Sequence, residues 1–145
     1  MKKLSKLLRK KYTAVKLKKT VTNHFEFKLK LNNIKGRFIL DTGASNTCVS
    51  MDLIEHFKLH AEDTETKAAG AGATDMATQI SKNNLLKIKK YKLDAVDIVL
   101  FDLSHVNTAL KMHQAEEVQG IIGADILEKT KAIIDYQTKK LYLKK

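Results

Sequence analysis

Apolar side chains occupy every second position of residues 25–31, and charged side chains stand between them. Because successive side chains of a strand point to opposite faces, this alternation predicts a half-buried strand. Asn32 and Asn33 then predict a turn. After the turn, the apolar run Phe38–Leu40 predicts a short buried strand that leads directly into Asp41.

The remaining pattern also favours strands, with two or three short helices. Ser50 is placed to cap a helix over residues 51–58, and Ser104 to cap a second helix. The chain therefore has the pattern of a mainly β protein, with a closed or sandwich-like barrel. The other predicted elements are strands at 47–49, 85–93, 96–101 and 120–123, a helix at 124–129, and a hairpin of 133–136 with 141–143.

Positive charge is concentrated at the start of the chain. The net charge is +11, from 27 basic and 16 acidic residues, and residues 1–20 hold nine of the basic residues and no acid. Residues 21–145 therefore carry 18 basic and 16 acidic residues. We predict a basic arm over 1–20 and one folded domain over 21–145. The arm is interpreted as solvated, and the alternative is a weak contact with nucleic acid or an anionic membrane.

Composition excludes several classes of protein. No apolar run approaches the roughly 20 residues of a membrane-spanning helix. The single cysteine, Cys48, excludes an internal disulfide framework and suits a reducing compartment. Residues 1–20 lack the apolar stretch of an export signal, so we expect a cytoplasmic protein.

Asp41, Thr42 and Gly43 form the segment with the clearest chemical meaning. A buried strand delivers the carboxylate of Asp41 into a turn, where Gly43 lets the backbone pass closely and Thr42 offers a hydroxyl group. Such a turn presents a carboxylate at the end of a strand. Taken alone, the segment is equally consistent with an ordinary turn.

Two later segments change this balance. A small-residue stretch at 68–74 predicts a hairpin tip, and the apolar pair Ile121 and Ile122 precedes Gly123 and a short helix. In this order the motifs resemble the retropepsin-like aspartic proteases, particularly single-domain bacterial members, over about residues 25–145. The resemblance implies a closed β-barrel of the retropepsin type and the activity of an aspartic endopeptidase.

The resemblance also assigns roles to individual residues. It implies that Asp41 is catalytic and that Ile122, Gly123 and Asp125 form a structural loop and helix start. The residues implied to support the active-site loop are Thr42, Gly43, Ala44 and Ser45, and those implied to form a substrate-covering flap are Gly70, Ala71, Gly72 and Ala73. Viral retropepsins usually have an Asp where this chain has Ser45 and an Arg where it has Ala124. Both partners of that ion pair are missing here, so neither leaves an unpaired charge.

Aspartic-protease chemistry requires two carboxylates around one water molecule. The chain contains one Asp-Thr-Gly segment, and 145 residues leave no room for a second lobe. We therefore expect Asp41 of a second copy to complete the site, on a two-fold axis between the two carboxylates. The expected partners are a second copy of the chain and a polypeptide substrate.

Other candidate sites are weaker. His56 and His60 have the spacing of two metal ligands on a helix but lack a third ligand and a general base, so we predict no metal and no cofactor. Cys48 is interpreted as a small buried side chain, with a redox-sensitive thiol as the alternative. The competing function is a catalytically weak or inactive retropepsin-fold module that dimerises or binds peptides.

Overall fold

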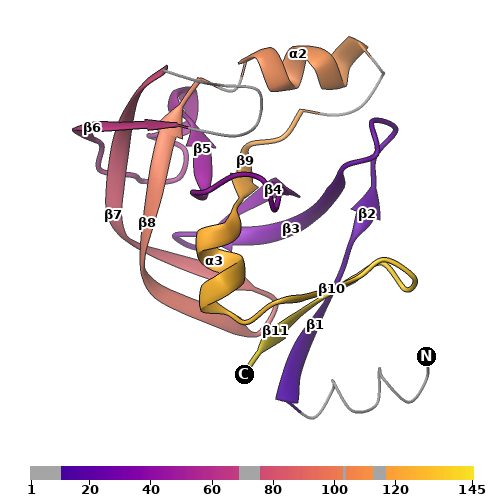
Figure 1. Cartoon of the computed structure of the whole chain (residues 1–145). Helices are drawn as coiled ribbons and strands as arrows, with labels where there is room; N and C mark the ends of the chain where they lie inside the picture. The colour runs from indigo at the N-terminus through magenta and orange to yellow at the C-terminus, as the bar shows by residue number, and fades with distance from the viewer. Residues whose placement is uncertain (1–10, 69–75, 103, 113–116) are drawn as a thin grey trace.

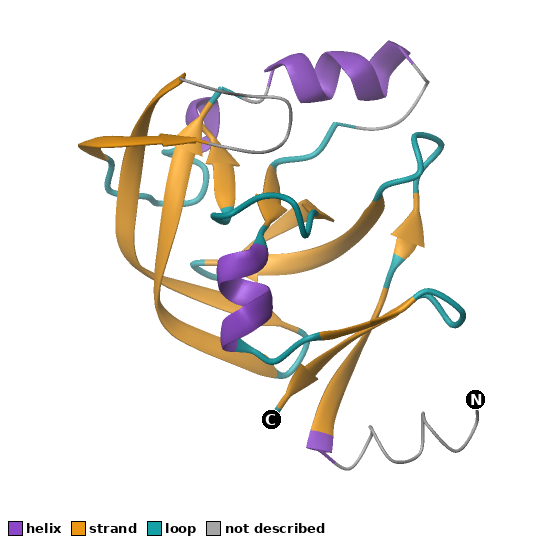
Figure 2. Ribbon diagram, in the orientation of Figure 1, coloured by secondary structure: helices purple, strands orange, loops and turns teal. Residues whose placement is uncertain are grey.

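The computed structural model describes residues 11–68, 76–102, 104–112 and 117–145. These residues form a mainly β structure with short helices (Figures 1 and 2). The strands are β1 (Tyr12–Lys16), β2 (Lys18–Lys19), β3 (Phe25–Leu31), β4 (Ile34–Leu40), β5 (Cys48–Ser50), β6 (Glu62–Ala68), β7 (Met76–Ile88), β8 (Tyr91–Phe101), β9 (Gly120–Ile122), β10 (Ile133–Asp135) and β11 (Lys140–Lys144). The helices are the 3-10 helix η1 (Met51–Leu53) and the α-helices α2 (Ser104–Met112) and α3 (Ala124–Lys129).

Six strands close into a barrel. Neighbouring strands follow the order β3, β4, β9, β5, β8 and β7, and β7 pairs back onto β3. The closing pairs are Lys30 with Lys87 and Leu31 with Leu86. Closure removes the free edges that an open sheet would expose. The prediction of a mainly β, closed barrel is therefore confirmed.

The alternating pattern of β3 places its apolar side chains in the barrel core. Phe27, Leu29 and Leu31 are buried, whereas Lys28 and Lys30 are exposed. Asn32 and Asn33 both take positive φ values, 51° and 68°, and form the tight turn to β4. The hairpin predicted from the sequence is thus present.

A second sheet joins the two ends of the described chain. It has the order β1, β11, β10, and the register places Tyr12 opposite Lys144. Val15 and Leu17 are buried in the main core. This differs from the predicted arm over residues 1–20, because residues 12–19 belong to the folded body. Residues 1–10 lie outside the described residues.

Two local predictions were wrong. The predicted helix over residues 51–58 is only the short η1, because Ser50 bonds to the Asp52 side chain instead of capping a helix, and Lys58 takes a left-handed φ of 57°. The predicted single strand over residues 85–93 is the end of the β7–β8 hairpin, with Ile88 opposite Tyr91. The polar segment at 62–68 is strand β6.

The other predicted elements that lie within the described residues are confirmed, including the β10–β11 hairpin and the helices α2 and α3, whereas the predicted hairpin tip at 68–74 lies almost entirely outside them. Within the described part of the chain, no helix has the length and hydropathy needed to cross a membrane.

Candidate active site

The loop that carries Asp41 crosses the end of strand β9. Strand β9 lies between β4, to which it is parallel, and β5, to which it is antiparallel. The connection from β4 to β5, residues 41–47, must therefore pass over the point where β9 ends. At this crossing the backbone N–H of Asp41 donates to the carbonyl oxygen of Ile122 at 3.0 Å. Barrel topology thus fixes where the carboxylate stands.

Backbone groups of the same loop hold the Asp41 side chain. The N–H of Gly43 donates to Oδ1 of Asp41 at 2.9 Å, and the N–H of Ala44 donates to the Asp41 carbonyl oxygen at 3.2 Å. Asp41 is half-buried, Ala44 is buried, and Thr42, Gly43 and Ser45 are exposed. The loop therefore presents an oriented carboxylate at the surface of a single chain, with its neighbours open to a second molecule.

Gly123 lies directly beneath this loop. A Cβ atom added to Gly123 would stand 2.7 Å from the carbonyl oxygen of Ala44 and 2.8 Å from that of Asn46. Both neighbours are backbone atoms, so no side chain can move aside. The next residue, Ala124, donates its N–H to the Ala44 carbonyl oxygen at 2.7 Å. The start of α3, which follows β9, therefore supports the loop through close backbone contact (Figure 1).

A buried polar contact joins the same segments. The hydroxyl group of Thr47 donates to Oδ1 of Asp125 at 2.8 Å and accepts the N–H of Gly123 at 3.1 Å. Thr47 has no exposed surface. This contact ties the end of the Asp41 loop to the first turn of α3. Sequence reasoning took Thr47 only as a strand residue, and no local signal indicated its partners.

Cys48 follows Thr47 and is 3% exposed, which agrees with its interpretation as a small buried side chain. Its thiol donates to the carbonyl oxygen of Asn46 at 3.1 Å. Burial, with smaller contributions from the negative charges of Asp125 and Asp41, raises the pKa of the Cys48 thiol to about 12. The thiol is therefore protonated at neutral pH.

The remaining residues that the sequence analysis considered for a site are the flap residues and two histidines. Gly70, Ala71, Gly72 and Ala73 lie outside the described residues, although the strands that flank them, β6 and β7, pair as an antiparallel hairpin. His56 and His60 are both exposed. Among the described side chains, no group of three or more His, Cys, Asp or Glu is arranged to hold a metal ion.

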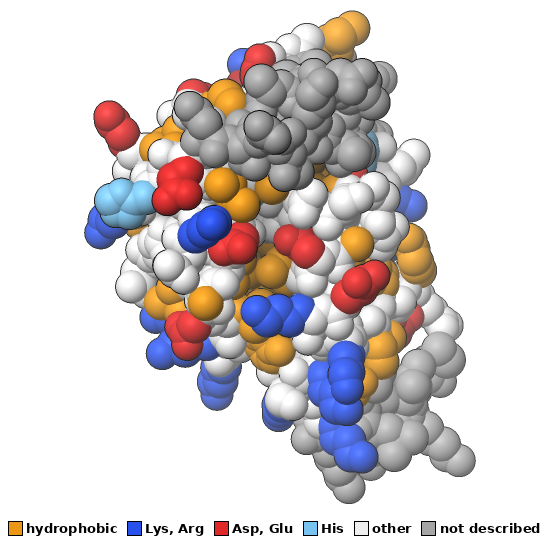
Figure 3. Space-filling model, turned by 60° about the vertical axis from the view of Figure 1, so that its left-hand side comes forward, with side chains coloured by type: hydrophobic (Ala, Val, Ile, Leu, Met, Phe, Trp, Pro, Cys, Tyr) orange, Lys and Arg blue, Asp and Glu red, His pale blue; other side chains and the backbone are white. Residues whose placement is uncertain are grey.

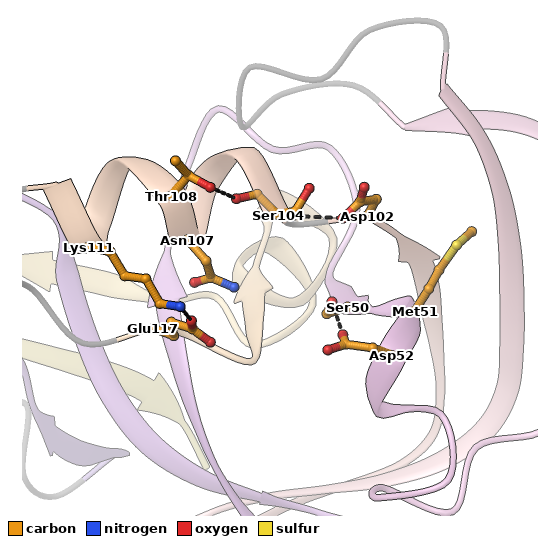
Figure 4. Close-up of a pocket in the computed structure, with 9 residues that line it drawn as sticks. All are labelled: Ser50, Met51, Asp52, Asp102, Ser104, Asn107, Thr108, Lys111 and Glu117. Carbon is orange, nitrogen blue, oxygen red and sulfur yellow. Dashed lines mark hydrogen bonds and ion pairs between the residues drawn. The ribbon is translucent and has the colours of Figure 1, made fainter.

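A pocket of about 530 Å³ lies between η1 and α2, and no residue of the Asp41 loop lines it (Figure 4). Polar groups in this pocket are paired with one another. Lys111 contacts Glu117, Ser50 bonds to Asp52, and the N–H of Ser104 donates to Asp102 at 2.8 Å. We therefore place the candidate active site at the Asp41 loop and not in this pocket.

A closed six-stranded barrel that presents one aspartate over a glycine-supported backbone crossing defines a retropepsin-like acid-protease fold. The family described as aspartyl protease matches residues 27–126, which include both Asp41 and Gly123. The chain belongs to this aspartyl protease family, whose members are peptidases.

Solved structures support the same fold. A retropepsin-like aspartic protease from Rickettsia conorii is similar with a TM-score of 0.59 and 18% identity, over 91% of this chain and 87% of that one. The retroviral protease-like domain of Ddi1 from Leishmania major gives a TM-score of 0.52 and 13% identity, over 81% and 86% of the two chains. The EIAV protease in complex with the inhibitor HBY-793 gives 0.52 and 16%, over 79% and 95%. Among curated proteins, none matches the sequence.

Proposed function

We propose that the protein is a homodimeric aspartic endopeptidase in which each copy contributes Asp41. The observation that carries this proposal is the exposed Asp41 loop, which offers one oriented carboxylate and no second one from the same loop. The chain contains no other Asp-Thr-Gly segment. A two-fold axis beside Asp41 would bring the second carboxylate from the other copy.

Two carboxylates supply the chemistry that one cannot. Like charges about 3 Å apart do not both ionise, so the pair shares a proton. The ionised Asp41 removes a proton from a water molecule, which attacks the peptide carbonyl carbon. The protonated Asp41 of the other copy donates to the carbonyl oxygen as it becomes negatively charged. Proton transfer to the amide nitrogen then releases the two peptide fragments.

The described loop supports these roles. The Gly43 N–H fixes one oxygen of Asp41, which lowers the reorganisation needed when charge develops. Thr42 is exposed and adjacent, so its hydroxyl group is available for a contact across the two-fold axis. A polypeptide in extended conformation suits this site, because β6 is the edge strand of the β6–β7 hairpin and a substrate backbone can pair with a free strand edge.

The test is Asp41→Asn, which keeps the size of the side chain but removes its ability to ionise. We expect the variant to lose cleavage of an unstructured protein substrate by a factor of about 10³ or more. Circular dichroism and thermal unfolding provide the control for folding. Full cleavage by this variant would contradict the proposal.

Mixing the two forms tests the shared site. When Asp41→Asn protein is equilibrated in excess with wild-type protein, most wild-type copies will pair with an inactive copy. Activity per wild-type copy should then fall with the wild-type fraction. An enzyme that works as a single copy would keep its activity in this mixture. A stable dimer that never cleaves peptides would instead favour the competing peptide-binding module.

A further inference from the structure

A lysine-lined groove lies far from the Asp41 loop. It has a volume of about 750 Å³, and seven lysines and Leu29 line it. We call it the lysine groove. It lies at the end of the barrel where the β3–β4 and β7–β8 hairpins turn. Lys35 is six residues before Asp41 along an extended chain, so the backbone of Lys35 lies about 20 Å from that of Asp41.

Four of these lysines stand side by side across four strands. The register pairs Lys35 with Lys30, Lys30 with Lys87, and Lys87 with Lys92. We call them the lysine row. Directly paired residues point to the same face of a sheet, and neighbouring strands lie about 4.8 Å apart, so the row spans about 14 Å. Like charges in this arrangement destabilise a sheet unless an anion neutralises them.

The part of the chain that the structure describes does not supply that anion. Among the described side chains, no carboxylate forms an ion pair with any of the seven groove lysines, and Lys87 donates a hydrogen bond to Oδ1 of Asn33 at 2.8 Å. Two lysines outside the groove do have carboxylate partners: Lys18 pairs with Glu26 and Lys111 with Glu117. Carboxylates are thus present on the surface but absent from this groove.

The groove also accounts for the positive charge of the folded body. Residues 12–145 hold 21 basic and 16 acidic residues, and without the seven groove lysines they would hold 14 and 16. Charge is therefore segregated and not evenly mixed. Figure 3 shows this on one face, where most Lys and Arg side chains lie in the lower half and most Asp and Glu side chains above them.

The basic surface continues beyond the groove. Lys28 and Lys89 also line an adjoining hollow of about 450 Å³, which adds Lys16, Lys18 and Arg37. Glu26 in this hollow is held by Lys18 at 3.9 Å and by Arg37 at 3.8 Å. The track of cations is thus longer than a single small anion needs and suits an extended polymer with a negative charge on every unit.

We propose that the lysine groove binds a single nucleic acid strand through its phosphate groups, without regard to base sequence. Lysine supplies point charges for phosphates, and no aromatic side chain lines the groove for base stacking. A membrane surface fits less well, because no apolar side chain protrudes from the groove to add to the electrostatic attraction, and its one apolar residue, Leu29, is buried. This proposal does not depend on peptidase activity.

The test compares two variants with the same change in net charge. The row variant is Lys30→Gln, Lys35→Gln, Lys87→Gln and Lys92→Gln, and the control variant is Lys58→Gln, Lys129→Gln, Lys139→Gln and Lys144→Gln, at exposed positions outside the groove. Fluorescence anisotropy of labelled oligothymidylate and oligoadenylate measures binding over a range of salt concentrations. Poly-glutamate of matched charge and phosphatidylserine vesicles serve as competing probes.

We expect the wild-type protein to bind the two oligonucleotides with similar affinity. The control variant should bind each of them as the wild-type protein does. Binding to the row variant should be weaker by more than about tenfold at low salt, and the slope of log K against log salt should be shallower by about 3. Equal binding by the row and control variants would overturn the proposal, because net charge alone would then explain it. Tighter binding of poly-glutamate or of vesicles would also overturn it.

A second measurement uses the unaltered protein, in case the row variant fails to fold. Acetylation of lysines, read by mass spectrometry, should be slowed by the oligonucleotide at Lys30, Lys35 and Lys92, which are exposed in the free protein. Lys58 and Lys129 should be acetylated at the same rate with and without it. A binding site in the groove would be contradicted if the oligonucleotide protected all of these lysines equally. It would also be contradicted if the oligonucleotide protected none of them.

Discussion

The hydroxyl group of Thr47 joins segments that are distant in the sequence. Its acceptor, Asp125, lies 78 residues further along the chain, and its donor, the Gly123 N–H, lies 76 residues further. Asp41 could be predicted because a local signal, a buried strand followed by Asp-Thr-Gly, marks it. Thr47 could not be predicted, since its hydrogen bonds form only when the pairing of β5 with β9 brings Gly123 and Asp125 beside it. Its role therefore becomes visible only in the folded chain.

Replacing Thr47 by Val tests this contact. The variant keeps the shape of the side chain but leaves the Gly123 N–H and the Asp125 carboxylate without their partner. We expect the free energy of unfolding to fall by about 1–3 kcal/mol in urea denaturation. Thr47→Ser, which retains a hydroxyl group, is the matched control and should lose clearly less. Equal losses in both variants would indicate that packing, and not the hydrogen bond, matters here.

Cys48 permits a prediction about pH. Burial raises the pKa of its thiol from its ordinary value of 9.0 to about 12, so the folded state holds a proton that the unfolded state releases first. The unfolded state therefore binds fewer protons between these values, and the contribution of this group to stability decreases as pH rises from about 9 to about 12. Below pH 9 the contribution should be constant.

The same thiol should be unreactive in the native protein. At pH 8 we expect iodoacetamide to modify Cys48 slowly in the folded state and rapidly in urea, because the thiolate is the reactive form and the folded state suppresses it. Mass spectrometry measures the extent of modification. If Cys48 is modified as fast in the native protein as in urea, its thiol is not buried and protonated as the structure indicates.

At the scale of secondary structure, β3 and the β7–β8 hairpin show what sequence patterns can and cannot reveal. Strict alternation located β3, because one of its faces is buried and the other solvated. The turn between β7 and β8 escaped prediction, since the chain reverses at two lysines with no Gly, Pro or Asn. Lys89 adopts a left-handed φ of 54° there. Strand pairing, and not local preference, imposes this turn.

Strand β1 was also missed, because nine basic residues over 1–20 suggested a solvated arm. Leu17, which follows β1, is 5% exposed in the barrel core. We expect Leu17→Ala to lower the free energy of unfolding by about 2–5 kcal/mol, as is usual for a truncated core leucine. Lys16→Ala, at an exposed neighbouring position, should change it little. An equally small effect of both changes would show that this segment does not contribute to the core.

At the scale of the whole molecule, the described residues form a closed barrel and a second, three-stranded sheet, and under the proposed function one copy holds half of the active site. Barrel closure depends on the pairing of Lys30 and Leu31 with β7. No pattern in the sequence predicts this pairing. The family resemblance, however, implied both the barrel and the position of the carboxylate. The exposed Asp41 loop makes association of two copies a requirement of the proposed function.

Activity should therefore depend on protein concentration. On dilution below the dissociation constant of the dimer, we expect cleavage per chain to fall, because separated copies each hold one carboxylate. Analytical ultracentrifugation should show dissociation over the same range. Two copies joined covalently in tandem should keep their activity on dilution. Constant activity of the unlinked protein as it dissociates would contradict the shared site.

The antiparallel pairing of β1 with β11 has a consequence for protein engineering. Tyr12 and Lys144 are separated by one strand spacing, about 5 Å, and the Lys145 N–H donates to the Lys11 carbonyl oxygen at 2.9 Å. A few flexible residues could join these positions without disturbing the sheet. New termini opened at the exposed Lys89–Lys90 turn would then give a circular permutant with the same barrel, in which the order of synthesis is changed but the architecture is not.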